Sequence, residues 1–216
     1  MKKGAIFDMD GLLFDTERIY QENWAKVIEI RGLTLDPAFP QALCGTSGDL
    51  MRQIIRKFYP SIAADDLIRD CFGRVNRHLE TDVPEKPGVH EILDMLHEAG
   101  VRIAVASSSD LPMIEHNLAM TGIRPYFDAV VSGQQVQHGK PAPDIFLLAA
   151  ERIGLPPQDC YVFEDGINGV RAGLAAGCTT IMVPDRFPPT DELLRGGAQV
   201  YDSLLDARDA ILRGAI

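Results

Sequence analysis

Residues 4–16 read GAIFDMDGLLFDT, and this stretch guides the interpretation of the whole chain. The apolar run at 4–7 is typical of a short buried strand, and Asp8 and Asp10 follow at its carboxyl end. Two carboxylates two residues apart repel each other and resist the loss of water. A Mg²⁺ ion would resolve this conflict, because it prefers hard oxygen ligands and needs only one or two carboxylates. Gly11 then lets the backbone turn sharply. The alternative is a strand that ends in a solvated acidic turn.

Beyond about residue 86, apolar runs alternate with helical patterns. We expect strands at 101–106, 129–131, 161–163 and 180–183, and helices at 89–99, 112–120, 143–153 and 167–176. Proline near the starts and glycine after the ends of the helical patterns are typical of helix boundaries. This alternation predicts an α/β fold: a Rossmann-like, doubly wound parallel sheet with helices on both faces. The run at 4–7 belongs to the same sheet, and residues 200–216 are expected to form a weak strand start and a helix.

The segment of roughly 17–84 has a different character. It contains no convincing strand pattern, and prolines and glycines punctuate it. Amphipathic helices are expected at 17–31, 50–58 and 65–79. We therefore expect residues 17–84 to form an all-helical cap domain, inserted into a core made of residues 1–16 and 85–216.

Composition excludes several classes of protein. The chain has 216 residues, a formal net charge of −10 and 46% hydrophobic residues, which fits one large domain or a core with a modest second domain. The negative charge argues against nucleic acid or an anionic membrane as the main partner, because both favour stripes of Lys and Arg. The sequence contains no run of about eighteen apolar residues, so no transmembrane helix is expected. Asp8 and Asp10 interrupt the first apolar run too early for a signal peptide.

The cysteines suggest a reducing environment. There are four, far apart and without a C-x-x-C pair: Cys44, Cys71, Cys160 and Cys178. Buried thiols are the expected state, rather than disulfides or a zinc site. We therefore expect a cytoplasmic protein. A monomer is the expected state.

Polar side chains follow four of the expected strands. After 4–7 come Asp8 and Asp10, and after 161–163 come Glu164 and Asp165. The strand at 101–106 is followed by Ser107, Ser108, Ser109 and Asp110, and the strand at 129–131 by a loop that leads to His138 and Lys140. Ligands of open α/β sheets bind outside the carboxyl ends of the strands. These groups are therefore expected to share one rim.

Acidic pairs, hydroxyls and one lysine at one rim suit phosphoryl transfer. A carboxylate can attack phosphorus and form an aspartyl-phosphate. A second carboxylate can protonate the leaving alcohol and then activate water. A Mg²⁺ ion would offset the repulsion between nucleophile and phosphate, while a lysine, a hydroxyl and backbone amides hold the phosphoryl oxygens. The expected partner is a small phosphorylated metabolite.

Four motifs carry a resemblance to a known family: DMDG at 8–11, VASSS at 105–109, GKPAPD at 139–144 and FEDGINGV at 163–170. In order and spacing they resemble the haloacid dehalogenase superfamily of phosphohydrolases, in the branch with a helical cap after the first strand. The strings DTE at 15–17 and QHGKPAPDIF at 137–146 are similar to sugar-phosphate and nucleotide phosphatases of the β-phosphoglucomutase-like group, which includes pseudouridine-5′-phosphatase.

The resemblance implies roles for the acidic residues. Asp8 would be the nucleophile and a metal ligand. Asp10 would be the general acid and base, with its backbone carbonyl on the metal. Asp165 would be a further metal ligand. Glu164 would lie beside the metal ligands without touching the metal, or contact the metal through water. The alternative for Glu164 and Asp165 is a helix-capping role, which is compatible with metal binding.

The resemblance also implies that Ser107, Ser108 and Lys140 bind the transferring phosphoryl group. Ser107 could instead cap the next helix, although Ser109 is the better candidate for the cap. Lys140 could be a solvated loop lysine, although the prolines beside it stiffen its position. His138 is expected to be a loop residue near the site rather than a metal ligand, since no partner stands at ligand spacing.

Two departures from the mutases of this group bear on the reaction. The position of the mutase His holds Tyr20, and the position of the mutase Arg, after Gly45-Thr46-Ser47, holds Gly48. A mutase must retain a bisphosphate intermediate, which favours a second cationic site, so both changes favour simple hydrolysis. Other cap cations could compensate, for example Arg52, Arg56 or Arg74.

Three functions therefore compete. The first is Mg²⁺-dependent hydrolysis of a small sugar or nucleoside phosphate, the second is phosphosugar mutase activity, and the third is a non-catalytic binding or regulatory role on the same fold. The presence of all the motif side chains argues against the third.

Overall fold

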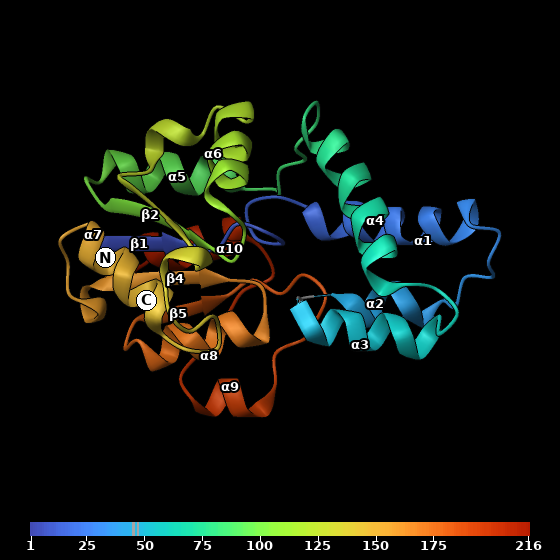
Figure 1. The fold of residues 1–216 in the computed structure, drawn as a ribbon. Coiled ribbons are helices and arrows are strands. Elements are labelled where there is room, and N and C mark those ends of the chain that lie inside the picture. The colour runs from blue at the N-terminus through green and yellow to red at the C-terminus, as the bar shows by residue number, and fades with distance from the viewer. Residues whose placement is uncertain (45, 47) are drawn as a thin grey trace. The chain divides into compact units, whose positions relative to one another are not determined.

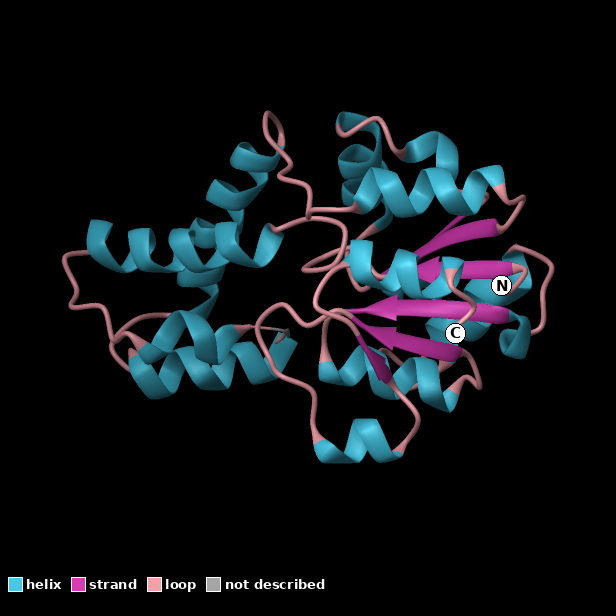
Figure 2. Cartoon of the chain, turned by 180° about the vertical axis from the view of Figure 1, so that it is seen from behind, coloured by secondary structure: helices cyan, strands magenta, loops and turns pink. Residues whose placement is uncertain are grey.

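Parallel strands form the centre of the larger of two compact units in the chain. The computed structural model describes residues 1–44, 46 and 48–216, and its six-stranded sheet has the order β3-β2-β1-β4-β5-β6. The arrows in Figure 2 all point the same way. The strands are β1 (Gly4–Phe7), β2 (Arg102–Ser107), β3 (Ala129–Ser132), β4 (Cys160–Glu164), β5 (Thr179–Met182) and β6 (Gln199–Val200). The predicted doubly wound parallel sheet is thereby confirmed.

Helices cover both faces of this sheet. In Figure 1, α7 lies in front of the sheet and α10 lies behind it. The α-helices described in this unit are α5 (Val89–Glu98), α6 (Leu111–Met120), α7 (Asp144–Arg152), α8 (Ile167–Ala175), α9 (Asp191–Arg195) and α10 (Leu204–Leu212). The short α9 was not predicted, because five residues are too few for a periodic pattern. None of the described helices is long and apolar enough to cross a membrane.

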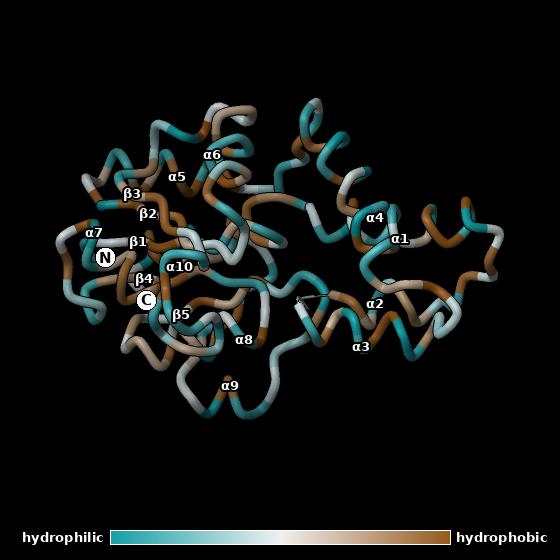
Figure 3. The backbone as a smooth tube through the Cα atoms, viewed as in Figure 1, coloured by the Kyte–Doolittle hydropathy of each residue, from teal (hydrophilic) through white to brown (hydrophobic). Residues whose placement is uncertain are grey.

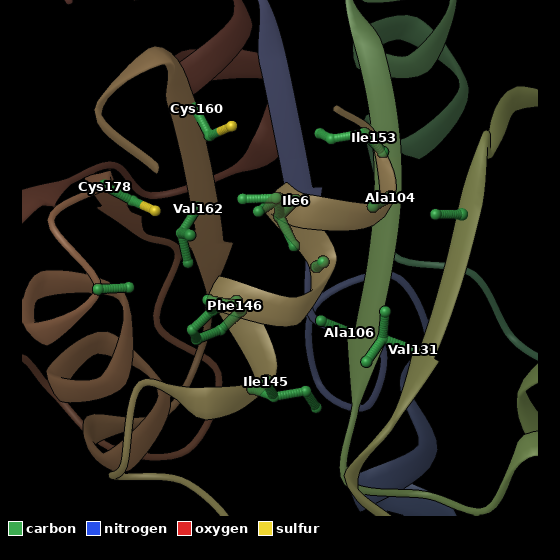
Figure 4. Close-up of a cluster of buried hydrophobic side chains, with 14 of the residues drawn as sticks. Ile6, Ala104, Ala106, Val131, Ile145, Phe146, Ile153, Cys160, Val162 and Cys178 are labelled. Carbon is green, nitrogen blue, oxygen red and sulfur yellow. The ribbon is translucent and has the colours of Figure 1, made fainter. Parts of the chain in front are cut away.

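The core follows from the alternation of side chains along the strands. On one face, Ile6, Ala104 and Val162 pack against α7 and α8 (Figure 4). On the other face, the rings of Phe7 and Phe163 are stacked with centroids 4.5 Å apart, and both residues are fully buried. Figure 3 shows β2 and β3 in brown, as expected for strands that are buried on both sides. Truncating either phenylalanine to alanine would cost about 3–5 kcal/mol.

The register of β1 and β4 brings two acidic motifs together. Phe7 pairs with Phe163, and the backbone N–H of Asp8 donates to the carbonyl of Phe163 at 3.0 Å. The chain order reverses between these two strands, and ligands of doubly wound sheets bind at such a switch point. The predicted acidic site residues therefore lie at the ends of the two central strands.

The second unit spans Asp15–Val83. It contains α1 (Thr16–Ile30), α2 (Ala38–Leu43), α3 (Gly48–Phe58) and α4 (Ala64–Leu79). Its core includes Trp24 and Phe39, whose rings meet edge to face at 5.8 Å. The short α2 was not predicted, because Pro37 and Pro40 were interpreted as breaks. Both prolines lie at the start of the helix, where a missing N–H is tolerated.

The larger unit comprises Met1–Phe14 and Pro84–Ile216, so the chain leaves it after Phe14 and re-enters it at Pro84. These two ends are tied together. Phe14 and Glu85 form an isolated antiparallel bridge, and the N–H of Lys86 donates to the carbonyl of Leu13 at 2.8 Å. Both connections to the second unit thus start from one paired segment.

Candidate active site

Asp8 lies at the centre of the rim formed by the strand ends. It follows β1 directly and only 7% of its surface is exposed. The Nζ atom of Lys140 donates to Asp8 Oδ1, and it also lies 2.7 Å from Glu164 Oε1 and 3.1 Å from the carbonyl of Ala106. One lysine thus joins the ends of β1, β2 and β4. It is not a solvated loop residue, because its side chain is only 9% exposed.

Three carboxylates form a cluster that could hold a cation. Ligand oxygens of Asp8, Glu164 and Asp165 all lie within 4.8 Å of one another. Gly11 turns with φ +87°, and a Cβ at this position would lie 2.4 Å from Asp165 Oδ2. Only a glycine lets the loop after β1 approach Asp165 so closely.

The electrostatics of this cluster favour a bound divalent cation. Burial raises the pKa of Asp8 to about 8, with Glu164 and Asp10 adding to the effect and Lys140 opposing it. Burial, followed by the charges of Glu164 and Asp8, also raises the pKa of Asp165 well above its ordinary value. One lysine therefore does not balance the negative charge, and a hard divalent cation would. The donor set of buried carboxylate oxygens fits such an ion.

Burial alone would lower the pKa of Lys140, but Asp8 and Glu164 outweigh burial and raise it. The ammonium is therefore charged at neutral pH. A fixed positive charge beside the predicted nucleophile is suited to binding a phosphoryl oxygen.

Asp10 points to a different set of partners. The hydroxyls of Ser107 and Ser109 donate to Asp10 Oδ2 at 3.2 and 2.8 Å. Ser107 is fully buried, and its Oγ accepts from the N–H of Ser109 at 3.0 Å. Two hydroxyls thus fix the carboxyl group of Asp10 beside the cluster without making it a member of that cluster.

The prediction that Ser109 caps the helix after β2 is wrong. Asp110 is the N-cap of α6, and its side chain accepts from the N–H of Met113 at 2.9 Å. A carboxylate in extended backbone accepts this bond well, which leaves Ser109 free to turn toward Asp10. Ser132 holds the loop from the other side by donating to the carbonyl of Ser109 at 2.7 Å. Sequence reasoning therefore missed Ser109 as a site residue.

Ser108 is exposed, and the hydrogen bonds described in this network join Asp10, Ser107 and Ser109. Its role in binding the phosphoryl group stays a prediction. His138 also stays outside the carboxylate cluster, with its Nδ1 3.0 Å from Asp144 Oδ2, as expected for a loop residue.

Glu164 is fixed by the helix that follows it. The residue is 2% exposed, and its Oε2 accepts from the N–H of Gly166 at 2.9 Å. A Cβ at Gly169 would lie only 1.6 Å from Glu164 Oε1. The second glycine of the FEDGINGV motif therefore leaves the space that the carboxylate fills.

Asp185 is a second residue that sequence reasoning missed. It lies in the loop after β5, with a side chain that is 8% exposed. Lys86 Nζ lies 2.7 Å from Asp185 Oδ1, and the charge of Asp185 contributes to the raised pKa of Asp165. No sequence motif indicates Asp185, because its contact with Lys86 joins positions about a hundred residues apart.

Two residues of the second unit stand where the sequence differs from the mutases of the group. The ring of Tyr20 meets that of Phe72 edge to face at 5.4 Å, so it packs within that unit. Gly48 is the first residue of α3 and has φ +55°. Gly45 and Ser47, which belong to the predicted G-x-S string, lie outside the described residues.

Comparison with known proteins identifies the family. Residues 5–183 match the family described as "Haloacid dehalogenase-like hydrolase". The chain belongs to the haloacid dehalogenase-like hydrolases. Within this family, it is 38% identical to the fructose-1-phosphate phosphatase YqaB of Escherichia coli strain K12, over 83% of this chain and 95% of that protein. It is 37% identical to a "Probable pseudouridine-5'-phosphatase" of Drosophila melanogaster, over 94% of this chain and 90% of that protein.

Solved structures of haloacid dehalogenase-like proteins share the fold. The crystal structure of a β-phosphoglucomutase from Clostridium difficile matches with a TM-score of 0.72 and 25% identity, covering 94% of this chain and 92% of that one. The predicted family, with its β-phosphoglucomutase-like and pseudouridine-5′-phosphatase-like relatives, is thus confirmed, and so is the prediction of an enzyme of the phosphatase type.

Proposed function

We propose that the chain hydrolyses a phosphomonoester of a small sugar or nucleoside through an aspartyl-phosphate on Asp8, with Mg²⁺ as its cofactor. The observation that carries the proposal is the placement of one charged lysine between Asp8 and Glu164, with Asp165 in the same cluster. A nucleophile, a phosphate-binding cation and a metal-binding carboxylate set then share one rim.

The first half of the reaction uses both aspartates of the DMDG motif. An oxygen of Asp8 attacks phosphorus, the bond between phosphorus and the leaving oxygen breaks, and Asp10 gives its proton to that oxygen. Lys140 and Ser107 bind the phosphoryl oxygens during this step. Ser109 keeps the carboxyl group of Asp10 in position, as its 2.8 Å hydrogen bond indicates.

The second half returns the enzyme to its starting state. Asp10, now a carboxylate, takes a proton from water as the water oxygen attacks phosphorus. The bond to Asp8 breaks, and inorganic phosphate leaves. A Mg²⁺ ion bound by Asp8, Asp165 and the backbone carbonyl of Asp10, with Glu164 close by, would offset the repulsion between carboxylates and phosphate.

Residues 17–84 are proposed to act as the cap of this site. The paired segment of Phe14 and Glu85, from which the chain leaves and re-enters the core, would be the base of a hinge. Closure would exclude water during aspartyl-phosphate formation and bring specificity residues to the leaving group.

The substrate class is supported by the relatives. The protein from Escherichia coli is named for fructose 1-phosphate and the one from Drosophila for pseudouridine 5′-phosphate. Both are small phosphomonoesters with a polyhydroxylated leaving group. We propose that this chain acts on the same class, as a monomer in the cytoplasm.

The test is a screen of sugar and nucleoside phosphates, with and without Mg²⁺, that measures phosphate release. Asp8→Asn should lower turnover by several orders of magnitude, since acid–base catalysis alone contributes about 10²–10⁴-fold and the nucleophile is lost as well. Asp202→Asn is the matched control, because Asp202 is exposed in the same unit. Near-normal turnover of Asp8→Asn, or full activity of metal-free protein in excess EDTA, would contradict the proposal.

A further inference from the structure

A groove lined by arginines lies between α1 and α4. These two helices pack against each other (Figure 1). Its volume is about 400 Å³, within the usual range for pockets that bind small molecules. All the residues that line it belong to Asp15–Val83. Four of them are arginines: Arg31, Arg69, Arg74 and Arg77.

The positive charge of this groove is only partly balanced. Arg31 Nε lies 3.2 Å from Asp70 Oδ2, and Arg69 NH2 lies 2.6 Å from Asp66 Oδ1. Arg74 and Arg77 form no ion pair with any residue in the described ranges 1–44, 46 and 48–216. The groove therefore has two surplus positive charges in a protein whose formal net charge is −10.

One of these two guanidinium groups also has an unpaired hydrogen-bond donor. Arg74 Nε is buried and has no hydrogen-bond partner in the described structure. Leaving a buried donor unpaired destabilises a protein, and more so when the group is charged. An anion bound beside this guanidinium group would balance its charge.

The lining of the groove includes a glycine in the interior of a helix. Gly73 lies in the middle of the 16-residue helix α4, where glycine is less stable than alanine. A Cβ at this position would meet only Arg77 NH1, at 3.9 Å, so α4 itself has room for alanine. The missing side chain instead widens the groove beside Arg74 and Arg77.

The chemistry of the walls indicates the ligand. Guanidinium groups bind phosphate and carboxylate oxygens through paired N–H donors, and Val27 and Ile30 add an apolar wall. We propose that this groove is a second ligand site, separate from the catalytic carboxylates, and that it binds a small organic phosphate through Arg74 and Arg77. The apolar part of the ligand contacts Val27 and Ile30.

The test uses the full-length protein in EDTA, so that no metal-dependent turnover occurs. Adenosine 5′-monophosphate, inorganic phosphate and uncharged adenosine are titrated while NMR follows the Gly73 amide and the Arg74 Nε–H. Both phosphates should shift these two signals in a saturable manner, with the nucleotide binding more tightly than phosphate, and adenosine should not. A shift by inorganic phosphate alone would overturn the apolar contact, and no shift by either would overturn the site.

Variants decide whether the two arginines carry the binding. Arg74→Gln with Arg77→Gln should weaken binding, read at the Gly73 amide, by at least about tenfold, the equivalent of one charge-assisted hydrogen bond. Lys26→Gln with Lys57→Gln removes the same charge from exposed positions outside the groove and should change the affinity by less than about twofold. Arg77→Gln alone, at an exposed position, gives the same reading if the double variant fails to fold. Equal affinity of the Arg77 variant and the lysine control would refute the proposal.

Discussion

Ser109 is the residue whose role is best separated from packing by experiment. Its hydroxyl donates to Asp10 Oδ2 at 2.8 Å, and a hydrogen bond to a charged group is worth about 1.5–3 kcal/mol. Ser109→Ala should therefore lower kcat by roughly tenfold or more on a sugar phosphate, whose leaving alcohol needs a proton. The loss should be much smaller on p-nitrophenyl phosphate, whose leaving group departs as a stable anion. An equal loss on both substrates would show that Ser109 does not act through proton transfer.

The raised pKa of Asp8 gives a second prediction at the same scale. Folding raises this pKa from 3.8 to about 8, so the folded protein retains a proton that the unfolded chain loses between these values. The contribution to stability is complete below about pH 4 and is lost as the pH rises to about 8, with a slope of at most about 1.4 kcal/mol per pH unit.

Urea unfolding of metal-free protein between pH 5.5 and 8 measures this slope. Asp8→Asn should make the decline shallower, whereas Asp202→Asn should leave it unchanged. A decline that is equally steep in Asp8→Asn and in the unmodified protein would mean that other groups cause it.

Helix α8 holds Glu164 in place, and this sets a prediction at the scale of the element. Gly169→Ala would put a methyl group 1.6 Å from the present position of Glu164 Oε1, so the carboxylate must move away from Lys140. We expect weaker Mg²⁺ binding and a loss of about 1–3 kcal/mol in the free energy of unfolding, as for other overpacked sites.

Gly73→Ala in α4 is the matched control for this loss. It is the same change in a helix interior with room for the methyl group, and it should raise stability by about 0.5–1 kcal/mol. Calorimetric titration of Mg²⁺ and urea unfolding measure the two effects. An Mg²⁺ affinity unchanged in Gly169→Ala would remove Glu164 from the proposed metal site.

The strands and loops also show how much of the structure could be predicted from the sequence. The strand at Gly4–Phe7 was predicted with its observed bounds, since acidic residues and Gly11 end the apolar run sharply. The rim was predictable because the carboxyl ends of parallel strands lie at one edge. Contacts between distant loops were not: the turn of Ser109 toward Asp10 depends on Asp110 taking the cap, and the pair of Lys86 and Asp185 has no local pattern.

At the scale of the whole molecule, the fate of the phosphorylated enzyme separates a phosphatase from a mutase. A mutase must pass the phosphoryl group to a second hydroxyl of a retained sugar, which favours an added cationic clamp. In this chain Tyr20 packs on Phe72 instead of supplying an imidazole, and Gly48 supplies no side chain. Water is therefore the expected acceptor. With β-glucose 1-phosphate, inorganic phosphate should accumulate and glucose 6-phosphate should not, with or without a trace of bisphosphate primer.

Time-resolved product analysis decides between the two outcomes, and Tyr20→His sharpens it. If the missing imidazole alone prevents isomerisation, this variant should release some glucose 6-phosphate beside the phosphate. If the missing clamp matters as well, it should release phosphate only, at a rate within about tenfold of the unmodified protein, because Tyr20 takes no part in the proposed hydrolytic steps. Conversion of glucose 1-phosphate to glucose 6-phosphate by the unmodified chain, without free phosphate, would make the mutase the correct assignment.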